Sequence, residues 1–352
     1  MTDGLLDLVA LGVALVVILV GAELFTNGIE WFGHKLDLAE GAVGSVLAAV
    51  GTALPETMIP TVAILFGGGA AAEAIGVGAV LGAPFMLATL AMFVTGVAVI
   101  VAGRSRPTGD RMIVARDVLG HDVRVFAVAY AIAIASALLP SELLAVRLGV
   151  AAVLLAIYVW YVKEHLEAEE RIEGATLAPL RFRHLDRRGH RRNPAVPRLR
   201  IVGVQVGVAL ACIVGGAVLF VEAVEAIARA VAVPEALLAL VIAPIATELP
   251  EKFNSVLWIR AGKDTLALGN ITGAMVFQAT IPTVIAIVFA SSTWVLGAGS
   301  ALAFASAAMA FLSAGLIFGP FGGSQLHGRR LLLGGLVYVG YLVLVGLALV
   351  GG

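Results

Sequence analysis

The sequence has little charge for its length. Only 13% of its 352 residues are Asp, Glu, Lys or Arg, while 60% are hydrophobic, which is far from the composition of a water-soluble domain. The single cysteine, Cys212, excludes an internal disulfide and a cysteine-based metal centre. The 23 basic and 24 acidic residues nearly cancel, so the charge balance gives no reason to expect nucleic acid as a partner. This composition indicates a polytopic membrane protein.

Motifs that would indicate an enzyme are also missing. The six histidines show no metal-ligand spacing, and the chain has neither a nucleotide-binding loop nor a nucleophile motif. We therefore expect no enzymatic activity, no resident cofactor and no ATP-driven pumping. Residues 1–4 carry no basic side chain, so we expect the first apolar run to be a retained helix rather than a signal peptide.

The hydrophobic residues are grouped into runs that match membrane-spanning helices. A helix needs about 20 residues to cross roughly 30 Å of hydrocarbon, and ten runs are long enough. The sequence thus predicts an all-α polytopic membrane protein with ten transmembrane helices. The runs lie at 5–33, 40–66, 72–102, 122–139, 143–163, 201–229, 235–260, 265–290, 296–318 and 329–351.

The basic residues predict how these helices are oriented. Of the 23 basic residues, 20 fall in loops that alternate to one side of the membrane, while Arg147 and Lys252 fall inside helices. The positive-inside rule places the basic side in the cytoplasm, so we expect both termini outside the cytoplasmic membrane of the cell. The segment 164–200 is then a cytoplasmic loop with too few apolar side chains for a core of its own. We expect it to be solvated, with binding of anionic lipids by its arginines as the alternative.

Two apolar runs are interrupted by a proline followed by a glutamate. The second run contains Gly51-Thr52-Ala53-Leu54-Pro55-Glu56, and the seventh contains Ala246-Thr247-Glu248-Leu249-Pro250-Glu251, 195 positions later. Proline frees backbone carbonyls, which are tolerated at membrane depth only where they face protein or a wet cavity. We therefore expect both helices to be broken. An ionisable side chain at that depth is costly, so a functional site is the default interpretation.

The two segments belong to a longer internal repeat. Aligning Gly21–Pro60 with Gly216–Ser255 without a gap gives 12 identities in 40 positions. Each half contains five predicted helices, and because five is odd the second half enters the membrane from the opposite side. The sequence predicts two inverted five-helix repeats, 1–163 and 201–352, joined by the loop 164–200. Transporters of this architecture bind substrate near the midplane, between discontinuous helices.

Glu56 and Glu251 are the candidate cation ligands. Two carboxylates at similar depth in opposite halves would be neutralised by a divalent cation or by protons. Thr52 and Thr247 lie four residues earlier and could add oxygens, which hard cations such as Ca²⁺ require. For the threonines alone, back-bonding to a helix carbonyl is the commoner role. The alternative for the glutamates is a structural pair of protonated carboxyls.

Three further polar residues extend the candidate site. Asn270 and Gln278 lie eight residues apart in the eighth run, on roughly one face of a helix, where buried amides either join helices or bind an ion. Glu248 is a third candidate. It lies four residues before Lys252, a spacing that favours an ion pair; the alternative is a Lys252 that faces lipid and snorkels.

These residues resemble the signatures of the cation/calcium exchanger superfamily, which includes the sodium/calcium and proton/calcium exchangers. The family pattern Gly-Thr-Ser-Leu-Pro-Glu corresponds to Gly51–Glu56, and Gly-Asn-x-x-Gly corresponds to Gly269–Gly273. The resemblance implies ten helices in two inverted fives, with Glu56 and Glu251 as the central Ca²⁺ ligands. It further implies that Thr52 and Thr247 contribute oxygens.

The chain departs from the family pattern at several oxygen-bearing positions. Ala53, Glu248, Ala83 and Ala274 stand where the family has serine, and Leu87 and Gln278 stand where it has polar or acidic residues. We expect an antiporter that exchanges Ca²⁺ or a similar divalent cation for Na⁺ or H⁺, with the lipid bilayer and the transported cations as partners and no obligate protein partner. The alternatives are a proton-coupled or monovalent-cation antiporter and a non-transporting, ion-binding scaffold or sensor.

Overall fold

The computed structural model describes residues 2–35, 54–104, 106–168, 178–185, 197–260, 262–297, 299–319 and 326–351. For some residues in these ranges, 248–254 among them, only the backbone is described. The described chain is almost entirely helical. Its elements are α1 (Thr2–Lys35), α3 (Leu54–Phe66), α4 (Ala70–Met86), the π-helical turn η2 (Leu87–Ala91), α5 (Met92–Ala102), α6 (Arg116–Ser136), α7 (Leu144–Ala168), the 3₁₀ turn η3 (Arg181–Leu185), α8 (Leu199–Val231), α9 (Glu235–Arg260), α10 (Asp264–Phe289), α11 (Ala301–Phe318), α12 (Gly328–Gly351), and the antiparallel strands β1 (Arg111–Met112) and β2 (Leu326–His327).

The helices have the length and composition of membrane spans. In the described residues, eight helical stretches are long and apolar enough to cross a membrane. One of them, Ala70–Ala102, runs continuously through α4, η2 and α5. Two shorter apolar stretches, Glu56–Phe66 in α3 and Glu235–Ile245 in the first part of α9, lie in the predicted second and seventh runs. The prediction of an all-helical, multi-pass membrane protein is confirmed.

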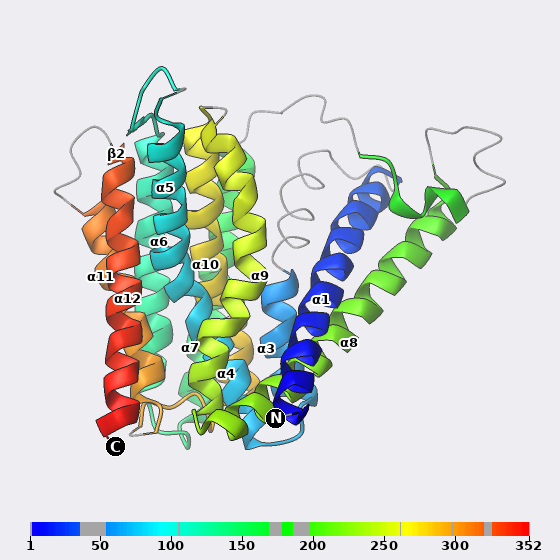
Figure 1. Ribbon diagram of the computed structural model, residues 1–352, viewed down its shortest axis with the longest axis vertical. Helices are drawn as coiled ribbons and strands as arrows, with labels where there is room; N and C mark the ends of the chain where they lie inside the picture. The colour runs from blue at the N-terminus through cyan, green and yellow to red at the C-terminus, as the bar shows by residue number, and fades with distance from the viewer. Residues whose placement is uncertain are drawn as a thin grey trace.

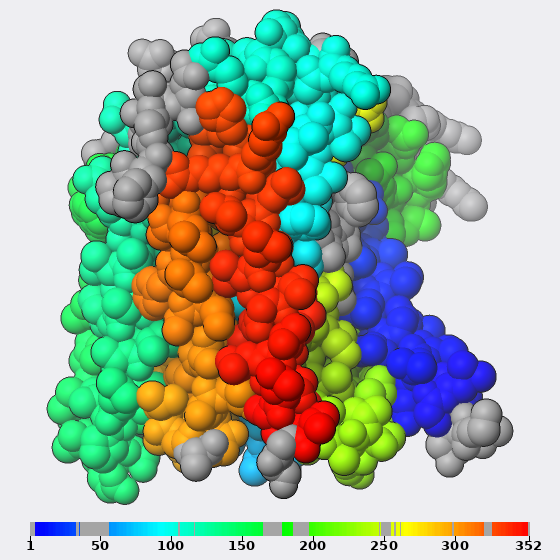
Figure 2. Space-filling model, turned by 60° about the vertical axis from the view of Figure 1, so that its left-hand side comes forward, coloured from blue at the N-terminus to red at the C-terminus, as the bar shows by residue number. Residues whose placement is uncertain are grey.

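The helices form a bundle in which one pair is set apart (Figure 1). α1 and α8 pack along each other and lean away from the other helices toward the end that carries η3. We call this end, which also carries β1 and β2, the loop end. α1 begins and α12 ends at the opposite end, the terminal end. The space-filling view shows α11 and α12 side by side on one face, with the residues after α5 above them at the loop end (Figure 2).

Small residues let α4 and α9 approach closely. A Cβ added at Gly78 would lie 2.1 Å from the carbonyl oxygen of Ala236, and one added at Gly82 would lie 2.1 Å from that of Leu240. Because no side chain fits at such distances, glycine at both positions permits the backbone contact, as small residues do in other membrane helix pairs. This contact places α9 directly against α4.

The contact between α1 and α8 is reciprocal. A Cβ added at Gly21 would lie 2.9 Å from Ile213, and one added at Gly216 would lie 2.7 Å from Ile18. Gly21 and Gly216 are separated by 195 positions, and so are Ile18 and Ile213. Each helix therefore receives an isoleucine of its partner at an equivalent glycine.

Residues 178–185, which we call the docked segment, pack on the loop ends of α1 and α8. Asn27 of α1 accepts from the Arg181 N–H at 3.0 Å, and Gln205 of α8 accepts from the Phe182 N–H at 2.9 Å. The two side chains also bond each other, with Gln205 donating to Asn27 at 3.0 Å. Leu180 is buried. Buried amides of the two helices thus hold the backbone of this part of the predicted loop, while most of its side chains are exposed, as expected for a solvated loop.

Replacement of Gln205 by leucine is expected to release the docked segment. The change keeps the size of the side chain but leaves buried polar groups without partners, at about 1–3 kcal/mol of stability. The measurement is thermal unfolding together with the rate of limited proteolysis within residues 178–185. Arg181→Ala is the matched control: it removes only the exposed ion pair with Glu23, which contributes about 0–1 kcal/mol. Equal proteolysis rates for Gln205→Leu and wild type would contradict the expectation.

Candidate cation site

Glu56 lies in the first turn of α3 and is 8% exposed. From Glu56 to Phe66 the helix rises about 15 Å, half the thickness of a hydrocarbon layer of about 30 Å. α3 begins about half way along the bundle and runs to the terminal end (Figure 1). By this rise the carboxylate lies near the middle of the apolar layer.

The second Pro-Glu segment lies in an unbroken helix. α9 is helical from Glu235 to Arg260, so the expected break at Pro250 is not found; neighbouring helices let membrane helices tolerate proline. Thr247 is buried and donates to the Ala243 carbonyl at 3.0 Å, which is the back-bonding anticipated for the threonines. Thr52 lies outside the described residues, as do the side chains of Glu248, Glu251 and Lys252.

α10 carries the two candidate amides. Gln278 is 1% exposed, and neither polar atom of its amide has a hydrogen-bond partner among the described residues. Asn270 is half-buried. α10 packs against α3, α4 and α9, so it adjoins the helices that carry Glu56 and Thr247. A buried amide without a partner is destabilising by about 1–3 kcal/mol, which makes Gln278 a group that a bound ion or water would satisfy.

The corresponding positions of α4 and η2 offer no side-chain oxygen. Ala83 and Leu87 are both buried. Thr89 donates to a carbonyl of its own helix at 2.5 Å. The π-helical turn shifts its carbonyls out of the usual helical register, and Ser313 of α11 donates to the Ala88 carbonyl at 2.5 Å. The candidate ligands among the described residues therefore come from α3, α9 and α10.

The structure adds a buried carboxylate that sequence reasoning missed. Asp122 of α6 is 1% exposed and accepts from the Tyr161 hydroxyl of α7 at 2.9 Å and the Thr272 hydroxyl of α10 at 2.6 Å. The predicted run 122–139 placed this residue at a helix edge, but α6 begins at Arg116. An aspartate at the start of a long apolar run is the signal that could have drawn attention to it.

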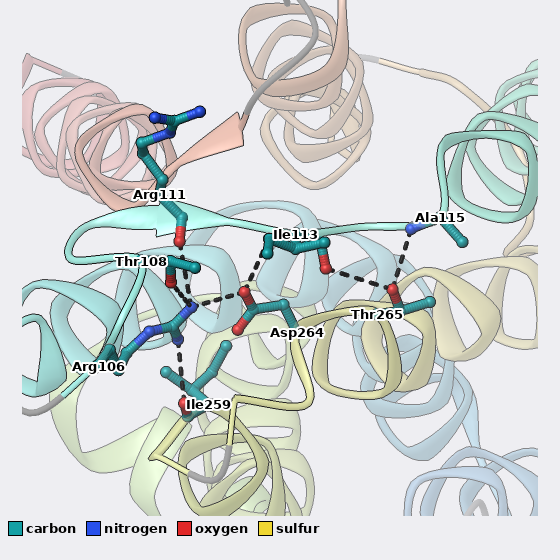
Figure 3. Close-up of polar contacts among 8 residues, drawn as sticks. All are labelled: Arg106, Thr108, Arg111, Ile113, Ala115, Ile259, Asp264 and Thr265. Carbon is teal, nitrogen blue, oxygen red and sulfur yellow. Dashed lines mark hydrogen bonds and ion pairs between the residues drawn. The ribbon is translucent and has the colours of Figure 1, made fainter.

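A buried ion pair lies at the loop end (Figure 3). Arg106 Nη2 is 2.6 Å from Asp264 Oδ2. The same carboxylate oxygen accepts from the Ile113 N–H at 2.9 Å, and Arg106 also donates to the Ile259 carbonyl at 3.0 Å. These bonds fasten the linker between α5 and α6 to the end of α9 and the start of α10. Arg106, which the topology prediction counted among the loop charges, is thus a buried structural group.

A second buried arginine fastens the opposite end of α10. Arg147 of α7 is fully buried and donates to the carbonyls of Leu139 at 2.7 Å and Trp294 at 3.0 Å. It also donates to the Ser291 hydroxyl at 2.8 Å and to the carbonyl of the same residue. The prediction that Arg147 falls inside a helix is confirmed, and these acceptors compensate the desolvation of its charge.

The buried charges converge on α10. In the described part of the chain five charged side chains are buried. One of them, Asp264, belongs to α10, two bond to residues of α10, and a fourth bonds to the residues just after it. The bonded positions lie at its start, in its first half and just beyond its end. α10 is therefore anchored at three heights. The buried charged residues are Glu56, Arg106, Asp122, Arg147 and Asp264.

Breaking the Arg106–Asp264 pair from one side is expected to destabilise the protein strongly. Arg106→Ala and Asp264→Ala each leave an uncompensated buried charge, which is destabilising by about 3–5 kcal/mol. The double variant should lose clearly less than the sum, because the partners interact directly. Thermal unfolding in detergent measures all three. Arg329→Ala, which removes the exposed pair with Asp110, is the control, with an expected loss below about 1 kcal/mol. Additive losses would show that the pair is not coupled.

Several solved structures share this fold. The H⁺/Ca²⁺ exchanger CAX superposes with a TM-score of 0.69 at 17% identity, over 96% of this chain and 82% of that chain. YfkE gives a TM-score of 0.60 at 12% identity, over 96% and 98%. The sodium-calcium exchanger NCX_Mj gives 0.53 at 17% identity, over 97% and 99%. At these identities the likeness shows the fold alone, and it is a fold found in membrane cation exchangers.

The chain belongs to the sodium/calcium exchanger protein family, whose model matches residues 6–163 and 202–350. It is therefore a cation exchanger of the membrane and not an enzyme, and the resemblance drawn from the Pro-Glu segments is confirmed. An uncharacterized membrane protein of Methanocaldococcus jannaschii is 43% identical over 53 residues, an alignment that covers 15% of this chain and 18% of that protein.

Proposed function

We propose that the chain is a secondary-active antiporter that moves Ca²⁺, or a similar divalent cation, in exchange for Na⁺ or H⁺ by alternating access. The observation that carries the proposal is Glu56, a carboxylate buried in the first turn of α3 within a bundle of apolar helices. Ionisable residues inside membrane segments are costly and rare, and by default they mark an ion pathway. Glu251, its repeat equivalent, supplies the second charge that a divalent ion requires.

The remaining oxygens come mainly from the second half of the chain. Ca²⁺ takes six to eight oxygen ligands from carboxylates, carbonyls and hydroxyls. Gln278 offers an amide oxygen that is buried and has no partner in the described structure. Thr247 keeps an acceptor lone pair after donating to Ala243. The proposed ligand set is Glu56, Glu251, Thr52, Thr247, Gln278, Asn270 and Glu248.

We further propose that ten spans form two inverted repeats, 1–163 and 201–352. The reciprocal packing of Gly21 and Gly216 against equivalent isoleucines supports this arrangement, because a two-fold relation between the halves produces such matched contacts. The eight long stretches lie in eight of the ten predicted runs and the two shorter ones in the other two, which supports the proposal. The loop end, which carries the basic linker after α5, is the cytoplasmic end of a cell membrane protein, and both termini are outside.

Two family positions that bear on the coupling ion are apolar in this chain. Positions at which the family carries oxygens for sodium hold Ala83 and Leu87, both buried and apolar. This loss favours exchange with fewer sodium ions, or with protons, over a three-sodium cycle. A chain that binds a divalent ion without transporting it would instead be a scaffold or sensor, and flux measurements distinguish the two.

Glu56→Gln is expected to abolish divalent flux while leaving a folded, inserted protein. The change removes one of the two charges that a divalent ion needs, and an amide of the same size preserves the packing. The measurement is uptake of Ca²⁺, Mg²⁺ and Mn²⁺ into proteoliposomes under imposed Na⁺ or H⁺ gradients. Glu222→Gln, the same substitution at an exposed position of α8, should retain flux. Wild-type rates in Glu56→Gln would remove the basis of the site assignment.

Serine at positions 83 and 274 is expected to increase sodium dependence. Ala83→Ser with Ala274→Ser restores two hydroxyl oxygens where the family has them, so sodium should bind more tightly or at an additional site. The measurement is the sodium-concentration dependence of Ca²⁺ flux, fitted for slope and midpoint. A steep multi-sodium dependence already present in the unmodified protein would contradict the expectation.

A further inference from the structure

α10 presents its candidate ligands and its mid-helix anchor on different faces. Helical spacing of about 100° per residue places Asn270 and Gln278 within about 80° of each other. The same spacing places Thr272 about 160° from Asn270 and about 120° from Gln278. The two amides therefore point in one general direction, while Thr272 points behind them toward α6, where it meets Asp122.

The anchor behind α10 is a charged hydrogen-bond cluster. The Thr272 hydroxyl is 2.6 Å from Asp122 Oδ2 and 3.2 Å from the Leu268 carbonyl of its own helix. The shorter contact is to the carboxylate, and hydrogen bonds to ionised acceptors are the stronger ones. Tyr161 donates to the other carboxylate oxygen at 2.9 Å. Three helices thus meet at one buried carboxylate.

α10 also rests directly on this cluster. A Cβ added at Gly273 would meet the Tyr161 hydroxyl at 3.4 Å, an ordinary contact distance. The backbone next to Thr272 therefore packs against the same tyrosine that bonds Asp122. Rotation of α10 about its axis would stretch the hydrogen bond from Thr272 to Asp122 and disturb the packing contact between Gly273 and the Tyr161 hydroxyl.

We infer that Asp122 is a positioning residue for the cation site: by holding Thr272, it sets the rotation of α10 and hence the direction in which Asn270 and Gln278 point. The inference rests on the proposed function. A side-chain atom about 6 Å from a helix axis moves by about 1 Å when the helix turns by about 10°. Ca²⁺ holds its oxygens at about 2.3–2.6 Å, so a displacement of that size changes which ion fits.

The other two anchors act at the ends of the helix. Asp264 and the residues bonded by Arg147 hold the start of α10 and the chain after it. Thr272 is two residues from Asn270 and six from Gln278, so it is the anchor nearest to both amides. Less than two turns of helix separate Thr272 from either amide, so loss of this anchor is expected to alter the direction of both.

The test compares two threonines of α10. Thr272→Val removes the hydroxyl but keeps the shape of the side chain, and Thr272→Ser restores the hydroxyl. Thr280→Val is the matched control on the same helix: Thr280 is buried, but its hydroxyl donates to carbonyls of α10 itself, at 2.8 Å and 3.0 Å. The readout is the ratio of the KM for Ca²⁺ to the KM for Sr²⁺ in proteoliposome uptake, since a loss of folded protein lowers Vmax without moving this ratio.

Thr272→Val is expected to shift the ratio by about threefold or more, because the two ions differ in the ligand distances they accept. Thr272→Ser and Thr280→Val should match wild type. Tyr161→Phe removes one donor to Asp122 and should shift the ratio in the same direction. If Thr272→Val does not fold, the ratio measured for Tyr161→Phe tests the inference in its place. An unchanged ratio overturns the inference while the loss of flux in Glu56→Gln still supports the proposed function. A wild-type protein without divalent flux overturns both.

Discussion

An ionised side chain inside an apolar bundle must be neutralised or hydrogen-bonded at close range, and this requirement organises the described structure around α10. Arg106 meets Asp264 at its start, Asp122 meets Thr272 in its first half, and Arg147 binds carbonyls beyond its end. Each of these groups would be destabilising without its partners. Because the partners lie on α6, α7 and the linkers beside them, satisfying the charges also fixes where α10 sits.

α1 and α8 are held by a different kind of contact. Their interface is formed by glycines that receive isoleucines, and the docked segment covers their loop ends through the amides of Asn27 and Gln205. The described residues of these two helices contribute no buried charge. The bundle therefore divides into a part joined by charged hydrogen bonds and a helix pair joined by apolar contact and neutral amides.

Helix α3, which carries Glu56, contacts helices of both parts. It packs against α4 and α10 and also against α8. On α10, Gln278 is buried with no hydrogen-bond partner among the described residues, whereas Ala83 of α4 and Leu87 of η2 are buried and apolar. Among the described residues, the proposed ligands thus come mostly from the second half of the chain, which is the physical reason to expect coupling different from that of a three-sodium exchanger.

The sequence alone determined the class of protein, the family and most of the helices. Hydrophobic runs of membrane length and two Pro-Glu segments in one repeat were sufficient, because span length and the cost of burying a carboxylate are local properties that can be read along the chain. Lys252 with Glu248, and Glu251 with Glu56, remain predictions of that kind, since the side chains of Glu248, Glu251 and Lys252 lie outside the described residues.

Only the tertiary structure decided which polar residues meet. Arg106 and Asp264 are 158 positions apart, and Asp122 and Thr272 are 150 apart. No local spacing reveals such pairs, because they depend on how helices from different halves are placed. The continuity of α9 through Pro250 and the docking of residues 178–185 were likewise decided by neighbouring elements. Adjoining helices can satisfy the carbonyls that a proline frees, and buried amides of α1 and α8 accept from backbone N–H groups of the docked segment.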